Sequence, residues 1–133
     1  MMRGPLNQQQ ATTGLKVAVR IMSAWCATPG QVCKILRISP STFRRASRGV
    51  ACGARLDADH QERIGLVLGI HGQLRATFSN QENVQGFPRL KNFNAFFDGR
   101  SPLEIMAQGD MISLYETYKR IERLHSGEVM AGQ

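Results

Sequence analysis

Acidic residues are missing from the first part of this sequence. Residues 1–56 contain nine lysines and arginines but no aspartate or glutamate, whereas residues 57–133 contain eight basic and ten acidic residues. The net charge of +7 therefore arises from +9 in the first part and −2 in the second. Clustered Lys and Arg gain affinity for polyanions by releasing counterions from phosphates. The asymmetry favours a nucleic-acid partner for residues 1–56, the alternative being a basic surface that is only solvated.

Cysteine is scarce and unpaired. The three cysteines are Cys26, Cys33 and Cys52, and no two of them form a C-x-x-C pair. This pattern argues against a disulfide framework and a zinc finger, and His60 stands at no structural-zinc spacing from them. We expect no metal. We also expect Cys26 and Cys33 to fill small spaces in the core of a protein from a reducing cytoplasm.

The motifs of common enzymes are also absent. The sequence has no glycine-rich phosphate loop after a strand, no H-E-x-x-H and no G-x-S-x-G. Asp98 and Glu104 are better explained as turn and capping carboxylates than as an acid–base pair. The sequence thus predicts a protein that is not an enzyme and needs no cofactor.

Long hydrophobic runs are absent too. The most apolar early stretch, residues 15–27, is interrupted by Lys16 and Arg20 and is too short to span a bilayer. Residues 1–14 are polar and have neither the apolar segment nor the cleavage site of a signal peptide. We therefore expect a cytoplasmic protein without a membrane partner, in which residues 1–14 form a flexible arm.

Apolar residues recur at helical spacing through most of the chain, which predicts an all-α fold. Trp25 is expected to anchor the core, and His71 is expected to be a hydrogen-bonded core histidine on a long central helix. The spacing predicts helices over residues 15–27, 29–36, 40–48, 57–78 and 111–124. Between them, residues 79–94 are expected to be irregular and attached to the core by Val84, Phe87, Leu90 and Phe93.

Only the three residues Arg37-Ile38-Ser39 separate the second and third predicted helices, which is typical of a helix-turn-helix. Arg37 stands where such motifs need left-handed backbone, at a cost to a non-glycine residue of about 1 kcal/mol. Phe43 and Ala46 would face inward, while arginine and hydroxyl side chains would reach base edges and phosphates. The predicted DNA-binding residues are Ser41, Thr42, Arg44 and Arg45 in the groove, with Lys34, Arg37 and Arg48 near the backbone. A generic packing unit of three helices is the alternative.

Two helix starts follow each other closely in residues 101–124. Ser101, followed by Pro102 and by Glu104 at the third position after it, predicts a capping box and a short helix. Gly109 can close that helix in the left-handed conformation, and Asp110 can cap the next one. The final helix has an apolar stripe expected to face the core, formed by Met111, Leu114, Tyr115, Tyr118, Ile121, Leu124 and His125.

Residues 96–110, Phe-Phe-Asp-Gly-Arg-Ser-Pro-Leu-Glu-Ile-Met-Ala-Gln-Gly-Asp, resemble the signature of the toxin-binding C-terminal domain of Xre/MbcA/ParS-type bacterial antitoxins. The run from Ala24 to Arg45 resembles the N-terminal, Xre-like helical domain of the same antitoxins. The resemblance implies an antitoxin of a type II toxin–antitoxin system. It also implies a helix-turn-helix and dimerisation domain over residues 15–56 and a helical toxin-binding domain with a flexible tail over residues 57–133.

The resemblance also implies the partners. The first domain would form a homodimer and repress the operon by binding promoter DNA. The second would neutralise a cognate toxin, a RES-domain enzyme that degrades NAD, in a higher hetero-oligomer, with the C-terminal end reaching into the NAD-binding cleft. The expected toxin-binding residues are Phe97, Arg100, Leu103, Met106, Tyr115, Tyr118, Lys119, Met130, Ala131, Gly132 and Gln133.

Two other functions stay open from the sequence. One is a helix-turn-helix transcription regulator with no toxin, whose C-terminal half serves dimerisation or effector binding. The other is an antitoxin that sequesters its toxin and never binds DNA. A growth-arresting gene next to this one would favour an antitoxin over the first alternative, and binding to promoter DNA would exclude the second.

Overall fold

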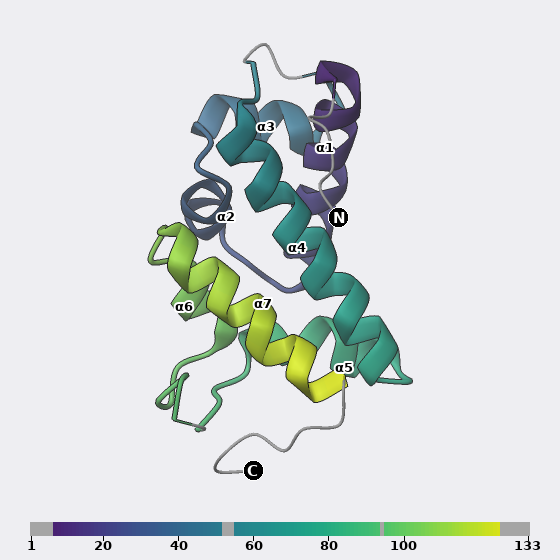
Figure 1. The fold of residues 1–133 in the computed structure, drawn as a ribbon. Helices are drawn as coiled ribbons and strands as arrows, with labels where there is room; N and C mark the ends of the chain where they lie inside the picture. Colours follow the sequence, from purple (N-terminus) through teal and green to yellow (C-terminus); the bar gives the residue numbers. More distant parts are fainter. Residues whose placement is uncertain (1–6, 52–54, 94, 126–133) are drawn as a thin grey trace.

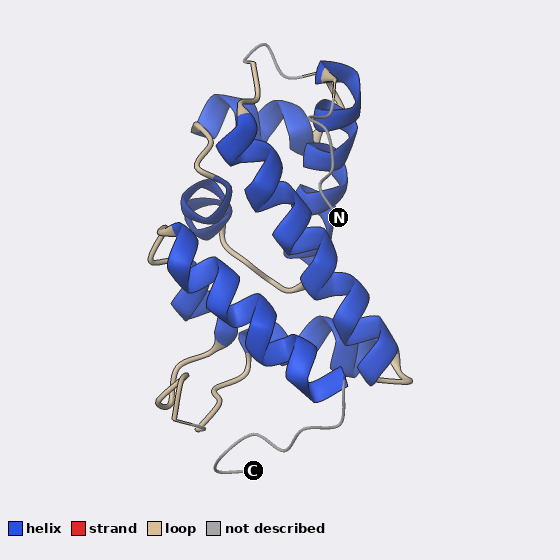
Figure 2. Ribbon diagram, viewed as in Figure 1, coloured by secondary structure: helices blue, strands red, loops and turns tan. Residues whose placement is uncertain are grey.

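The structure, a computed structural model, describes residues 7–51, 55–93 and 95–125. Over these ranges the chain forms helices joined by loops, with no strand beyond an isolated bridge between Asn92 and Arg100 (Figure 2). The predicted all-α fold is confirmed. The tail that includes Met130–Gln133 lies outside the described residues. The elements are α1 (Gln8–Ala24), α2 (Pro29–Leu36), α3 (Pro40–Ser47), α4 (Ala58–Thr77), α5 (Gln81–Gly86), the 3-10 helix η1 (Phe87–Arg89), α6 (Pro102–Met106) and α7 (Met111–His125).

Helix α1 begins seven residues earlier than the predicted start at Leu15. Asn7 caps it, because its side chain accepts the amide of Gln10 at 2.7 Å while the Gln10 side chain accepts the amide of Asn7 at 3.2 Å. Ala11 is then fully buried. The prediction of a flexible arm is therefore wrong for residues 8–14. These polar residues suggested a coil, but the cap satisfies amides at the start of the helix and Ala11 packs into the core.

Helix α4 is the central element of the fold (Figure 1). Asp57 caps it as predicted, and it packs against α1 and α2 with its first half and against α7 with its second. The approach to α7 is close at Gly69, where an added Cβ would lie 2.8 Å from the ring of Tyr118. A residue without a side chain at this position lets the two helices lie side by side.

The core does not divide at the predicted domain boundary. One cluster of buried side chains includes Leu15 and Ile35 from before residue 56 and Val67 and Leu114 from after it. Trp25 is fully buried in the same cluster, as predicted. The two predicted parts therefore share one hydrophobic core.

The segment predicted to be irregular contains two short helices. Asn80 caps α5 by accepting the amide of Asn83 at 2.8 Å, and η1 follows directly. Val84 attaches the segment to the core as predicted. Leu90 and Phe93 do not, since they are 61% and 74% exposed.

Two smaller predictions about the core are wrong. Cys26 is exposed rather than buried, because it follows the end of α1 in a left-handed turn with φ 66°, whereas Cys33 is half-buried. Cys52 lies outside the described residues. His71 lies on α4 as predicted, but its buried Nδ1 has no hydrogen-bond partner in the described part of the chain. Burial, together with the charge of Arg75, lowers the pKa of His71.

Candidate functional site

The turn between α2 and α3 has the backbone expected of a helix-turn-helix. Arg37 follows the last residue of α2 as its C-cap and has the predicted left-handed conformation with φ 57° and ψ 48°. Ser39 caps α3, and its hydroxyl accepts the amide of Thr42 at 3.1 Å. Pro40 occupies the first helical position, where its missing N–H costs nothing. Residues local to the turn thus fix the angle at which α3 leaves α2.

Helix α3 has one packed and one exposed face. Phe43 and Ala46 pack toward the core as predicted. Thr42 is only 7% exposed and its hydroxyl is bonded to that of Ser39 at 3.0 Å. The prediction that Thr42 reaches a DNA groove is therefore wrong, because it lies one helical turn before Ala46 on the packed face. The other predicted DNA-binding residues of this segment are exposed, namely Ser41, Arg44, Arg45 and Arg48.

Arg37 is exposed, but its charge is compensated within the chain. Its Nε lies 2.7 Å from Asp59 Oδ2 and its Nη2 lies 3.3 Å from Asp57 Oδ2. The hydrogen bond to Asp59 raises the pKa of Arg37. The prediction that Arg37 contacts DNA phosphates is not supported, because the guanidinium already has two carboxylate partners. Lys34, by contrast, is exposed and forms no ion pair with the described residues.

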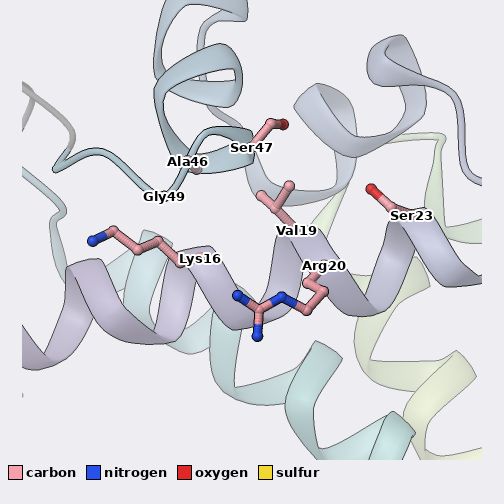
Figure 3. A pocket seen from close by; sticks show the side chains of 7 residues that line it. All are labelled: Lys16, Val19, Arg20, Ser23, Ala46, Ser47 and Gly49. Carbon is pink, nitrogen blue, oxygen red and sulfur yellow. The ribbon is translucent and has the colours of Figure 1, made fainter.

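A hollow of about 240 Å³ opens between α1 and the end of α3 (Figure 3). Lys16 and Arg20 line it from α1, one helical turn apart, and neither forms an ion pair within the described ranges. Figure 3 shows the Lys16 and Arg20 side chains projecting from α1, with Ser47 and Gly49 on the other side of the hollow. None of the lining residues is acidic, so the hollow has a positive character; they are Lys16, Val19, Arg20, Ser23, Ala46, Ser47 and Gly49.

The corner between α6 and α7 forms as the sequence predicts. The Ser101 hydroxyl accepts the amide of Glu104 at 3.1 Å, and the Glu104 carboxylate accepts the amide of Ser101 at 2.8 Å. Gly109 closes the corner with φ 93°, and Asp110 accepts the amide of Ser113 at 2.9 Å. These amide hydrogen bonds stabilise the ionised carboxylates and lower the pKa of both Glu104 and Asp110.

Three of the predicted toxin-binding residues belong to the interior. Phe97 and Met106 are fully buried and Leu103 is 3% exposed. A side chain without exposed area has no surface to offer a partner, so their prediction as interface anchors is wrong for this conformation. Their apolar character reflects packing of the corner.

The other predicted residues lie on or near the surface. Tyr115 is 46% exposed, Arg100 is exposed, and Lys119 pairs with Glu122 at 2.8 Å. Tyr118 packs against the hydrophobic core and lies against Gly69 of α4. Tyr115 and Lys119 therefore offer contact area on α7, whereas much of Tyr118 is used in holding α7 to α4.

Sequence reasoning missed Ile112, which is 74% exposed on the first turn of α7. Ile112, Tyr115 and Lys119 stand at positions i, i+3 and i+7, so they form a second face of α7, which we call the outer face. The buried face of α7 contains Leu114 and Ile121. The spacing of Ile112 from Tyr115 was a usable signal, since Ile112 fits neither the core stripe nor a polar surface.

Sequence reasoning also missed Arg63, a buried arginine on α4 that is 5% exposed. Its Nη1 donates to the carbonyl oxygen of Ile35 at 3.1 Å and to that of Gly109 at 2.9 Å, and its Nε lies 3.0 Å from Asp59 Oδ2. Burial raises the pKa of Asp59, but the hydrogen bonds and charges of Arg37 and Arg63 outweigh it and leave that pKa below its ordinary value. Arg63 thus joins the end of α2 to the α6–α7 corner.

Some kinds of site are missing from the described residues. These ranges contain no group of three or more His, Cys, Asp or Glu side chains placed to hold a metal ion. None of the described helices combines the length and hydropathy needed to cross a membrane. The groupings that the structure does present are the basic surface of α3, the hollow beside it and the outer face of α7.

No family model matches the sequence. Among curated proteins, the chain is similar to one of Sinorhizobium fredii (strain NBRC 101917 / NGR234) that is described as the uncharacterized protein y4oB. The two are 30% identical over 115 residues, which cover 85% of this chain and 84% of that protein. The similarity thus extends over most of the length of both proteins. The chain therefore belongs to the same family as the Sinorhizobium fredii protein y4oB.

Proposed function

We propose that this chain is the antitoxin of a type II toxin–antitoxin system. It neutralises a cognate toxin through the outer face of α7 and represses its own operon by binding promoter DNA through α3. The resemblance of residues 96–110 to antitoxins points to a RES-domain enzyme that degrades NAD as the toxin. The N-terminal helices would pair two copies of the chain, so that two α3 helices engage one operator.

The observation that carries the toxin-binding proposal is the exposure of Ile112 and Tyr115 beside the corner that resembles the toxin-binding signature. Single apolar side chains on a surface are common, but two of them on adjacent turns of one helix make a contiguous patch. Aromatic and aliphatic anchors contribute most of the energy of protein interfaces. Lys119 stands at the edge of this patch, where interfaces are usually polar.

The DNA-binding proposal is supported by the exposed arginines of α3. Arg44 and Arg48 form no ion pair within the described residues, and Arg45 donates one hydrogen bond, from Nη1 to the carbonyl oxygen of Ala51 at 3.1 Å. Most of their guanidinium donors therefore stay available for bases and phosphates. The helix carries no carboxylate that would oppose a phosphate.

Co-purification tests the toxin-binding proposal. The chain is expressed with the product of the neighbouring gene, one of the two carries an affinity tag, and the recovered complex is weighed by native mass spectrometry. The double variant Ile112→Ala/Tyr115→Ala should lose the complex, because removal of two anchors costs about 2 kcal/mol or more each. Leu90→Ala/Phe93→Ala is the matched control, since it also truncates two exposed apolar residues.

Two outcomes would contradict the proposal. If the wild-type chain purifies alone, there is no neutralised partner and a regulator without a toxin becomes the better account. If both double variants retain the complex equally, the outer face of α7 is not the interface.

Binding to the promoter tests the second part. Anisotropy of a labelled promoter duplex across a salt series should give tight binding that weakens steeply with salt. Arg44→Ala/Arg45→Ala should abolish it. Unchanged affinity in that variant would mean that α3 does not bind the promoter. If the wild-type chain does not bind the promoter, an antitoxin that only sequesters its toxin becomes the better account.

A further inference from the structure

We infer that the hollow between α1 and α3 is a second phosphate-binding position of the DNA interface, at which Lys16 and Arg20 contact the DNA backbone. The inference rests on the DNA-binding part of the proposed function and extends the interface beyond the helix-turn-helix. Its ligand is a backbone phosphate of duplex DNA, contacted outside the groove in which α3 lies.

The first argument is the charge pattern of α1. Lys16 and Arg20 project from adjacent turns, where like charges repel each other. Arg63 and Lys119 have carboxylate partners, Asp59 and Glu122, whereas Lys16 and Arg20 form no ion pair within the described residues. The hollow that Lys16 and Arg20 share contains no acidic side chain. An anion placed there would be attracted by both cations and would relieve their repulsion.

The second argument is the position of the hollow. It is bounded on its other side by Ser47 at the end of α3 and by the turn at Gly49 (Figure 3). Arg48 lies between these two residues in sequence, so the hollow borders the basic surface of α3. In helix-turn-helix complexes the recognition helix lies in the major groove while neighbouring helices cross the backbone. A phosphate beside the end of α3 would therefore lie close to α1.

The third argument is that the hollow is open and carries small polar donors. A Cβ built at Gly49 meets no atom within 4 Å, so nothing in the described chain closes the space beside this turn. Ser23 and Ser47 are exposed and add hydroxyl donors, a side-chain type that often binds phosphate oxygens. These two hydroxyls and the two cations are the polar side chains that line the hollow.

The test compares two double variants that remove the same charge from different places. Lys16→Gln/Arg20→Gln removes the two cations of the hollow. Arg75→Gln/Lys91→Gln removes two exposed cations from the second part of the chain. Both full-length proteins are titrated against the labelled promoter duplex and against a scrambled duplex of equal length, from about 50 to 200 mM salt, the range over which phosphate contacts strongly change affinity. Thermal unfolding confirms that both variants fold.

Loss of this one phosphate contact reduces the magnitude of the slope of log K against log salt by about 0.9 and the affinity at about 0.1 M salt by about 8-fold. The loss should be equal for the two duplexes, because backbone contacts carry no sequence information. An affinity and a slope equal to those of Arg75→Gln/Lys91→Gln would overturn the inference while leaving binding through α3 intact. If the wild-type chain binds neither duplex, the DNA-binding part of the proposed function fails and this inference fails with it.

Discussion

Replacement of Arg63 by methionine should destabilise the protein more than any surface change. The arginine is 5% exposed and its Nη1 donates to the carbonyl oxygens of Ile35 and Gly109. Methionine fills similar space but leaves the carbonyl oxygens of Ile35, which is buried, and of Gly109, which is partly buried, without this donor. A buried acceptor that loses its partner costs about 1–3 kcal/mol, so the two together should cost about 2–6 kcal/mol. The free energy of unfolding of a domain this size is about 5–15 kcal/mol, which makes the loss easy to measure.

Arg37→Met is the matched control for this prediction, because Arg37 also pairs with Asp59. Its side chain is 53% exposed, and exposed ion pairs contribute only about 0–1 kcal/mol. Urea unfolding followed by circular dichroism gives both values by linear extrapolation, provided that the slope with urea stays unchanged. Equal losses in the two variants would refute the reasoning, since they would mean that Arg63 acts only through Asp59.

The remaining predictions concern one glycine and one histidine. Gly109→Ala should lower the free energy of unfolding by about 1–2 kcal/mol, because φ 93° is unfavourable for alanine. Gly72→Ala should raise it by about 0.5–1 kcal/mol, because Gly72 is at an open position on α4 where alanine favours the helix. Urea unfolding checks both, and a loss in both variants would contradict the prediction. His71 has a lowered pKa, so the unfolded chain takes up this proton at a higher pH than the folded one. The stability linked to His71 is present above about pH 6.5 and is lost as the pH falls through that value toward the folded pKa. His71→Leu should abolish this part of the pH dependence of the free energy of unfolding. If that pH dependence is unchanged in the variant, His71 is not its source.

Features that depend on neighbouring residues were predictable from the sequence. The capping box at Ser101, the cap at Asp57 and the left-handed Gly109 each need only a few consecutive residues, and all of them form. Arg37 adopts its left-handed conformation for the same reason. At helix starts the capping side chains accept amides that the helix leaves unpaired, and at helix ends the left-handed residues let amides donate to unpaired carbonyl oxygens.

Features that depend on distant residues were not predictable in the same way. In the sequence, Arg63 looks like one of several polar residues near the start of a helix. Its burial cannot be predicted there, because the carbonyl oxygens that it binds belong to α2 and to the corner after α6. Burial of Phe97 and Met106 depends likewise on how the corner packs. An apolar residue in a signature motif does not show by itself whether it faces a partner or the core, and this ambiguity explains why the predicted toxin-binding list mixed the two.

The angular position of residues on short helices was the other source of error. Thr42 and Ser41 are neighbours in sequence, yet Thr42 is buried and Ser41 is exposed. A helix of eight residues contains only about two turns, so its pattern of apolar residues does not show which hydroxyl residue lies on the packed face and which on the exposed face. The start of α1 was missed because the residues before Leu15 are mostly polar, so that the cap at Asn7 is not followed by an apolar pattern that would indicate a helix.

Growth of bacteria that express the neighbouring gene's product tests the central claim most directly. The account predicts that this product alone stops growth, and that growth resumes when the wild-type chain or the Leu90→Ala/Phe93→Ala variant is expressed with it. The Ile112→Ala/Tyr115→Ala variant should fail to restore growth although it folds. Continued arrest in the presence of the folded wild-type chain would contradict the claim that this protein is an antitoxin.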